Sequence, residues 1–221
     1  MTTYLITGAN RGIGLEFCLQ LASRADNVIA TCRTSSKELR NIGVRVEEGI
    51  DITSKESINT LKNKLGNIKI DVLINNAGIL ENTNLSNLNR EKILNLLNVN
   101  AISPLLFSRL LLPNLTIGSK IIFITSRMAS IQDNTSGGSY GYRMSKVALS
   151  MAAKSLSIDL KDKGISVGIL HPGLVRTRMT GFTESGITPN HSVTGMLNII
   201  DKLKKDQTGT FFHSNGEILP W

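Results

Sequence analysis

Short apolar runs that alternate with helical patterns constrain the fold of this chain more than any other feature. Short apolar runs favour buried strands, whereas apolar residues spaced three and four apart favour amphipathic helices. The expected strands are Tyr4–Thr7, Val28–Cys32, Val44–Glu48, Ile70–Ile74, Lys120–Thr125, Ile165–Leu170 and Gly209–His213. The expected helices are Gly12–Arg24, Ser54–Leu65, Arg90–Leu112, Tyr140–Lys163 and His191–Lys204. This alternation predicts right-handed crossovers and a parallel sheet covered by helices on both faces.

Composition narrows the class of protein. A chain of 221 residues that is 41% hydrophobic can bury one substantial core, and we expect a single domain over residues 1–221. No apolar run reaches about 18 residues and no secretory signal is evident, which predicts a soluble protein with no membrane partner. Two cysteines, Cys18 and Cys32, suggest a reducing, cytoplasmic compartment. The net charge of +8 is scattered, which favours a solvated surface over nucleic-acid binding.

A glycine-rich turn follows the first expected strand. The segment reads Thr7-Gly8-Ala9-Asn10-Arg11-Gly12-Ile13-Gly14 and leads into an amphipathic helix. Glycine lets the backbone turn tightly and approach a pyrophosphate, and the helix N-terminus supplies N–H donors. The spacing G-x3-G-x-G only partly meets the general dinucleotide pattern, but the strand before it and the helix after it support a dinucleotide site.

The second expected strand indicates which dinucleotide binds. An NAD site places an acid at the end of this strand to hold the ribose 2′-hydroxyl. Here the strand ends with Cys32-Arg33-Thr34, and the nearest acid, Asp26, precedes it. Arg33 and Arg11 suit a 2′-phosphate through charge-assisted hydrogen bonds, so the sequence predicts NADP(H).

Two further segments at strand ends could meet the cofactor. Thr53 and Glu56 are expected to form a capping box for the next helix, which leaves Asp51 available to an adenine amine. The fourth strand ends with Asn75-Asn76-Ala77-Gly78, whose small residues would let a cofactor pass close to the backbone.

Tyr142 and Lys146 are the residues that most directly suggest chemistry. They lie four apart at the start of an expected helix and therefore share one face. A neighbouring ammonium favours the phenolate, so we expect Lys146 to lower the pKa of Tyr142 and tune it for proton transfer. Tyr140 is the rival, but Met144 occupies the position four residues after it.

Asn100 precedes Pro104 by four residues in a long expected helix. Proline has no N–H to donate, so the Asn100 carbonyl is expected to be open, either at a kink or bound to water. Serines follow the fifth expected strand at Ser126 and Ser130. His171, His191 and His213 have no metal-like spacing, and we interpret them as structural or solvated.

Taken together, these motifs resemble the short-chain dehydrogenase/reductase family over residues 1 to about 180. The matching motifs are TGxxxGxG at Thr7–Gly14, NNAG at Asn75–Gly78, Asn100, the serine, YxxxK at Tyr142–Lys146 and PGxVxT at Pro172–Thr177. The ending Gly216–Trp221 and the pair Cys32-Arg33 are similar to the small carbonyl-reductase and C-factor-like branch. The resemblance implies one Rossmann-type, doubly wound α/β sheet with seven strands in the order 3-2-1-4-5-6-7.

The resemblance also implies roles for individual residues. Ser126 would polarise the substrate oxygen, Tyr142 would protonate it, and Lys146 would also hold the nicotinamide ribose. The Asn100 carbonyl would bind a water that resupplies the proton through Lys146, while hydride comes from the cofactor. The expected cofactor contacts are Gly8, Asn10, Arg11, Gly12, Ile13, Gly14, Arg33, Asp51, Ile52, Asn76, Ala77, Gly78, Tyr142, Lys146, Pro172, Gly173, Val175 and Thr177.

Two departures from the family pattern leave alternatives open. Ser126 lies 16 residues before Tyr142, an interval longer than usual, so Asn134–Gly138 looks inserted and Ser130 is a second candidate for the serine role. The stretch from Arg178 to Pro189, where relatives often carry a longer substrate lid, is short.

Two classes of function follow. The first is an NADPH-dependent carbonyl reductase or alcohol dehydrogenase acting on a small molecule. The second is a cofactor-binding signalling or interaction protein with little turnover, since fold alone does not fix function. The four separated catalytic positions favour the first. The family's helix pairing allows a homodimer or homotetramer, and its small carbonyl reductases can be monomers.

Overall fold

A single parallel sheet organises the molecule. The computed structural model describes residues 1–221 and contains seven strands. They are β1 (Thr3–Thr7), β2 (Asn27–Cys32), β3 (Arg45–Glu48), β4 (Val72–Asn75), β5 (Lys120–Ile124), β6 (Ser166–His171) and β7 (Phe211–His213). All neighbouring pairs are parallel and the order is β3-β2-β1-β4-β5-β6-β7, which confirms the predicted architecture.

The helices occupy nearly the predicted places. They are α1 (Gly12–Ser23), α2 (Lys37–Asn41), α3 (Lys55–Leu65), α4 (Arg90–Leu97), α5 (Ser103–Leu110), α6 (Tyr140–Asp159) and α7 (Pro189–Lys202). The short α2 was not predicted; Ser36 caps it by accepting a hydrogen bond from the Leu39 N–H. The last predicted turn of α6 is absent, because the chain turns after Leu160 and Gly164 takes a φ of +67°.

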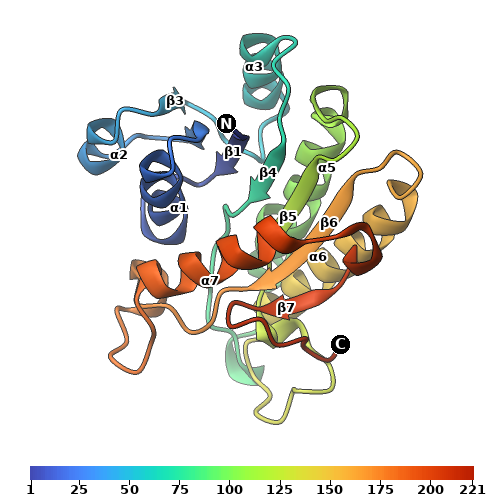
Figure 1. The fold of residues 1–221 in the computed structure, drawn as a ribbon. Coiled ribbons are helices and arrows are strands. Elements are labelled where there is room, and N and C mark those ends of the chain that lie inside the picture. Colours follow the sequence, from blue (N-terminus) through green and yellow to red (C-terminus); the bar gives the residue numbers. More distant parts are fainter.

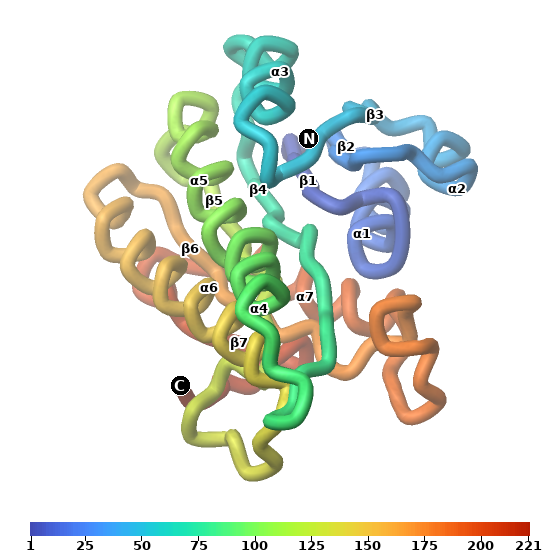
Figure 2. The backbone as a smooth tube through the Cα atoms, turned by 180° about the vertical axis from the view of Figure 1, so that it is seen from behind, coloured from blue at the N-terminus to red at the C-terminus, as the bar shows by residue number.

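Helices cover both faces of the sheet, as expected for parallel strands. Alternate strand residues point to opposite faces, so Leu5 lies in one hydrophobic core and Ile6 in the other. The first core is shared with α3, α5 and α6, and the second with α1, α2 and α7. Figure 1 shows α1 and α7 in front of the sheet, and Figure 2 shows α4, α5 and α6 from behind.

The segments that follow β4, β5 and β6 lie at one end of the sheet. They form the lower part of the molecule in Figure 1. The carboxyl ends of parallel strands meet at one edge, and in open α/β sheets this edge carries the ligand site. The predicted site residues therefore gather there from separate parts of the sequence.

The long helix predicted over Arg90–Leu112 is interrupted. A π-helical turn, Asn98–Ile102, separates α4 from α5, and the Ser103 N–H donates to the Asn98 carbonyl five residues back. Single π turns inside helices are frequent at functional sites. The whole stretch Arg90–Leu110 is long and apolar enough, by mean hydropathy, to cross a membrane, although the core helix of a soluble protein passes the same test.

The predicted capping box at the start of α3 is wrong. Ser54, not Thr53, is the N-cap residue, and its side chain accepts from the Ser57 N–H. Thr53 instead donates its N–H and its hydroxyl to Asp51 Oδ1, at 2.8 and 2.7 Å. One carboxylate oxygen of Asp51 is therefore already engaged in a local turn, which the sequence had left free.

Candidate active site

The glycine turn after β1 packs tightly against the turn after β4. Gly8 has a φ of +67°, and a Cβ there would lie 2.9 Å from Ala77 Cα. A side chain on Gly14 would collide with the Gly8 carbonyl. The Thr7 hydroxyl accepts from the N–H groups of Asn76 and Ala77, both at 3.0 Å. The two predicted motifs thus form one backbone surface, and these glycines have no room for a side chain.

The start of α1 is open to a ligand. Arg11 precedes the helix in an extended conformation, and no side chain caps the first turn. Uncapped N–H groups at a helix start can bind an anion. A Cβ on Gly12 would lie 3.4 Å from Thr177 Cγ2, so the PGxVxT segment reaches this turn from the far half of the chain.

The end of β2 presents a positive charge beside this turn. Asn10 Nδ2 donates to the Thr34 carbonyl at 3.0 Å, which ties the glycine turn to the segment after β2. Arg33 and Arg11 are exposed and form no ion pair. Burial raises the pKa of Asp51, but hydrogen bonds from Thr53 and the nearby Arg33 charge outweigh it and hold the pKa below its usual value. The Gly49 N–H also donates to the Arg33 carbonyl at 3.1 Å, so the segments that carry Arg33 and Asp51 adjoin.

Asn100 fixes the chain after β4 against α6. Its Oδ1 accepts from the Ile79 N–H at 2.8 Å, and its Nδ2 donates to the Ile79 carbonyl at 2.9 Å and to Ser145 Oγ at 3.0 Å. A Cβ on Gly78 would lie 3.1 Å from Asn100 Oδ1 and 3.6 Å from Lys146 Nζ. Gly78, Asn100 and Lys146 are thus adjacent.

Tyr142 and Lys146 share one face of α6, as their spacing predicted. The Lys146 Nζ lies 5.8 Å from the Tyr142 ring centroid and donates to the Ile124 carbonyl at 3.0 Å. Tyr142, Lys146 and Ser126 are each buried, with exposed fractions of 8%, 5% and 8%. The rival Tyr140 is half-buried.

Burial, not the neighbouring charge, controls ionisation at this site. It raises the pKa of Tyr142 to about 12, and the neighbouring Ser126 side chain lowers that pKa only in part. Burial also lowers the pKa of Lys146 to about 8. The prediction of a lowered tyrosine pKa is therefore wrong for the protein without cofactor, because the cost of removing a phenolate from water dominates. Tyr142 is held in its proton-donating form at neutral pH.

The two candidate serines lie in different surroundings. Ser126 interacts with Tyr142, and its Oγ accepts from the Met128 N–H at 3.2 Å. The Ser130 hydroxyl donates to the Trp221 carbonyl at 3.2 Å and accepts from the Asp133 N–H at 3.0 Å. Ser130 thus serves to hold the loop, and Ser126 is the serine beside the tyrosine.

The loop predicted as an insertion is fastened to α6. Arg143, next to Tyr142, donates to Ser136 Oγ at 2.9 Å and to the Gly138 carbonyl at 3.2 Å. Arg127 adds an ion pair with Asp133 at 2.7 Å. Sequence reasoning missed Arg143, because nothing in its local pattern distinguishes it from an exposed helix arginine.

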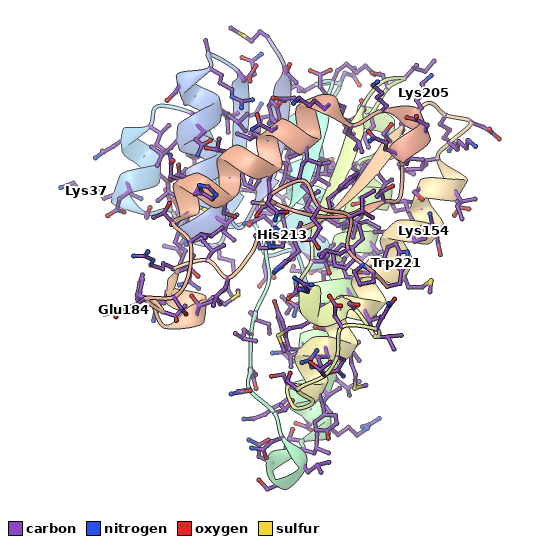
Figure 3. All side chains as sticks on the ribbon, turned by 60° about the horizontal axis from the view of Figure 1, so that its bottom comes forward. Lys37, Lys154, Glu184, Lys205, His213 and Trp221 are labelled. Carbon is purple, nitrogen blue, oxygen red and sulfur yellow. The ribbon has the colours of Figure 1, made fainter.

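The segment after β6 leaves the sheet through a sharp turn. Gly173 has a φ of +84°, and the Pro172 carbonyl accepts hydroxyl hydrogen bonds from Ser192 at 2.6 Å and Ser214 at 3.2 Å. Val175 then pairs with Ile187, which closes the short lid segment at its base. Figure 3 shows Glu184 near the outer tip of this segment.

Two of the predicted contacts, Ile13 and Ile52, contribute mainly to packing. Ile13 packs against the core shared with α1, and Ile52 lies within the core shared with α3.

His171 and His213 form a pair that the sequence did not reveal. They end the adjacent strands β6 and β7 in register, with ring centroids 4.9 Å apart and an edge-to-face geometry. Burial, followed by the charges of His213 and Arg127, lowers the pKa of His171 to about 3. His171 is therefore neutral. The available signal for this pair was that both histidines lie at the ends of strands predicted to be neighbours in the sheet.

Known proteins are similar to this chain in sequence and in fold. Residues 2–187 match the short chain dehydrogenase family. The chain is 37% identical over 226 residues to 1-hydroxy-2-glutathionyl-2-methyl-3-butene dehydrogenase from Rhodococcus sp. (strain AD45), covering 100% of both chains. It is 41% identical over 155 residues to the C-signal of Myxococcus xanthus, covering 69% of this chain and 93% of that protein.

A solved structure agrees in fold over the full length. The NADPH-bound carbonyl reductase from chicken fatty liver superposes with a TM-score of 0.89 at 31% identity, covering 100% of this chain and 99% of that one. The family match spans most of the chain, and the full-length relative extends it to the remainder. This chain therefore belongs to the short-chain dehydrogenase/reductase family of oxidoreductases.

Proposed function

We propose that this protein is an NADP(H)-dependent oxidoreductase that reduces an aldehyde, ketone or quinone to an alcohol, or runs the reverse reaction. One observation carries the proposal. Ser126, Tyr142 and Lys146 are buried together at the carboxyl edge of the sheet, with Gly78 and Asn100 beside the lysine. A phenol, a hydroxyl and an amine so placed can bind a carbonyl oxygen and deliver a proton to it.

The residues present fit NADP(H). Gly8, Gly14 and Gly78 leave a surface without side chains along the turns after β1 and β4, where a Cβ would meet backbone or polar atoms. Arg33 and Arg11 are exposed and unpaired beside the uncapped start of α1, a suitable setting for the pyrophosphate and the 2′-phosphate. The similar chicken carbonyl reductase has NADPH bound. We propose that residues 1–221 act as one cofactor-binding domain.

The protein's part in the reaction is positioning and proton transfer. The bound cofactor supplies or accepts the hydride. Ser126 donates a hydrogen bond to the substrate oxygen, and Tyr142 gives that oxygen its proton as negative charge develops. Lys146 holds the ribose hydroxyls and, when protonated, offsets the cost of leaving a phenolate in this buried site. The Asn100 carbonyl binds a water that resupplies the proton.

The test is loss of NADPH absorbance in the presence of aldehydes, ketones and quinones, with alcohols and NADP⁺ for the reverse direction. A glutathione-conjugated alcohol belongs in the panel because one full-length relative is named for such a substrate. Tyr142→Phe should abolish turnover because it removes the proton donor, while leaving NADPH affinity within about threefold because it removes little packing. A fully active Tyr142→Phe variant would refute the mechanism.

Tyr140→Phe is the matched control for that variant. Tyr140 lies two positions before Tyr142 and is half-buried, but the residue four positions after it is Met144, whereas Lys146 stands four positions after Tyr142. We expect near-normal turnover. If Tyr140→Phe were the inactive variant instead, the assignment of the proton donor would be wrong.

The 41% identity to the C-signal favours a second candidate function, that of a cofactor-binding signalling protein with little turnover. The same assay separates the two. Tight NADPH binding without turnover on any member of the panel would favour the signalling function over the reductase.

A further inference from the structure

The helix turn that carries Tyr142 is not held by its own residues. α6 begins at Tyr140, so the Gly141 N–H belongs to the first turn and has no partner within the helix. The preceding Ser139 is in the left-handed region, with a φ of +47°, and its side chain does not cap the helix. This first turn has no capping side chain of its own, and the residue before it has a strained backbone conformation, so another part of the chain must hold the turn in place.

Thr83 supplies the missing cap from 58 residues earlier in the chain. Its Oγ1 accepts from the Gly141 N–H at 3.0 Å, and its exposed fraction is 2%. Next to it, Asn82 Oδ1 accepts from the Ser139 hydroxyl at 3.0 Å. A Cβ on Gly141 would lie 2.7 Å from Leu96, so the same turn also packs closely on α4.

Thr83 lies on the segment that Asn100 anchors at Ile79. Figure 2 shows the chain running from β4 to the start of α4, next to the beginning of α6. The segment that begins at Gly78, beside Lys146, therefore ends on the turn that presents Tyr142. The segment from Gly78 to Thr83 therefore links the proposed cofactor site, at Gly78, to the helix turn that carries the proposed proton donor.

We infer that Thr83 is a positioning residue for Tyr142, acting through its hydrogen bond with the Gly141 N–H. The inference rests on the proposed function, in which Tyr142 gives the proton. It adds that the tyrosine's position depends on a hydroxyl outside α6, and that loss of this hydroxyl lowers kcat without altering cofactor binding. Misplacement of a catalytic group by about 1 Å can reduce turnover on the order of 100-fold.

The experiment compares Thr83→Val, Thr83→Ser and Asn89→Ala. Valine matches the size of threonine but cannot accept the hydrogen bond, whereas serine keeps the hydroxyl. Asn89 caps α4 by accepting from the Lys92 N–H at 2.9 Å, so Asn89→Ala removes a cap of the same kind from the same segment but not from α6. The readouts are kcat, substrate KM and NADPH affinity, together with melting temperature to keep each assay below unfolding.

We expect Thr83→Val to lower kcat by about 10-fold or more, with NADPH affinity unchanged. Thr83→Ser should restore most of the loss, and Asn89→Ala should lower the melting temperature while leaving kcat near normal. Normal kcat in Thr83→Val, no rescue by serine, or an equal loss in Asn89→Ala would each overturn the inference. Thr83→Ala serves in place of Thr83→Val if the valine variant does not fold.

Tyr142→Phe, measured in parallel, separates the two ideas. If Tyr142→Phe is inactive and Thr83→Val is normal, only the positioning role fails. If Tyr142→Phe is fully active, the proposed function itself fails.

Discussion

At Lys146, burial favours the neutral amine, whereas the proposed function uses the protonated one. A buried amine favours its neutral form, and the pKa of Lys146 falls to about 8 from its ordinary value of 10.5. Its one hydrogen bond, to the Ile124 carbonyl, does not compensate for lost hydration. The residue therefore destabilises the folded chain when it is charged, a cost that a purely structural position would not retain.

Lys146→Met should stabilise the cofactor-free protein near neutral pH. The folded pKa is depressed, so the cost of charging Lys146 is fully present below about pH 8 and disappears as the pH rises toward 10.5. We expect a gain of up to about 3 kcal/mol at pH 7, and a much smaller gain at pH 10. Denaturant unfolding at the two pH values measures it. A gain of equal size at both would show that packing, not charge, is responsible.

Arg33 tests cofactor choice at a single position. Charge-assisted hydrogen bonds contribute about 1.5–3 kcal/mol, so Arg33→Asp should weaken NADPH binding roughly 10- to 100-fold and shift preference toward NADH. Lys161→Glu is the control for net charge, because Lys161 is exposed just beyond the far end of α6. Fluorescence titration with both cofactors gives the affinities. Equal affinity of the unmodified protein for NADPH and NADH would contradict the assignment.

The α4–α5 unit shows how one proline changes an element. The sequence predicted a disturbance at Asn100 because Pro104 cannot donate to its carbonyl, and the structure resolves it as the π turn Asn98–Ile102. That turn places the Asn100 side chain against both Ile79 and Ser145. The interruption is thus part of how the element holds the site together.

Pro104→Ala should separate helix stability from turnover. Proline costs about 3 kcal/mol in an unconstrained helix, but Pro104 is buried, so lost packing offsets part of the gain and the unfolding free energy should hold or rise. A restored N–H would compete for the Asn100 carbonyl and slow proton resupply. Melting temperature, turnover and the solvent isotope effect are the measurements. Unchanged turnover and isotope effect in a variant with a regular helix would make Asn100 purely structural.

At the scale of the whole molecule, the site forms where distant segments meet. Gly8 lies against Ala77, Gly12 faces Thr177, and Gly78 lies beside both Asn100 and Lys146. The first two contacts join segments that follow different strands, and the third joins the segment after β4 to the π turn and to α6. The strand order brings these ends to one edge, so the site is a consequence of topology.

The sequence alone determined the features that depend on local periodicity and backbone chemistry. The alternation of apolar runs and helical patterns predicted the parallel sheet, and the four-residue spacing predicted that Tyr142 and Lys146 share a face. The glycine turn and the lack of a backbone N–H at Pro104 could also be read from the sequence, because each depends only on residues close together in the chain.

Only the tertiary structure decided the features that depend on distant partners. Thr83 caps α6 across 58 residues, and Ser126 rather than Ser130 lies beside Tyr142. The sequence predicted a lowered pKa for Tyr142, whereas the structure raises it. Residue spacing reveals the ammonium four residues away, but not how much water the rest of the fold removes from the phenol. Desolvation sums over every segment that packs on a group, so no local pattern contains it.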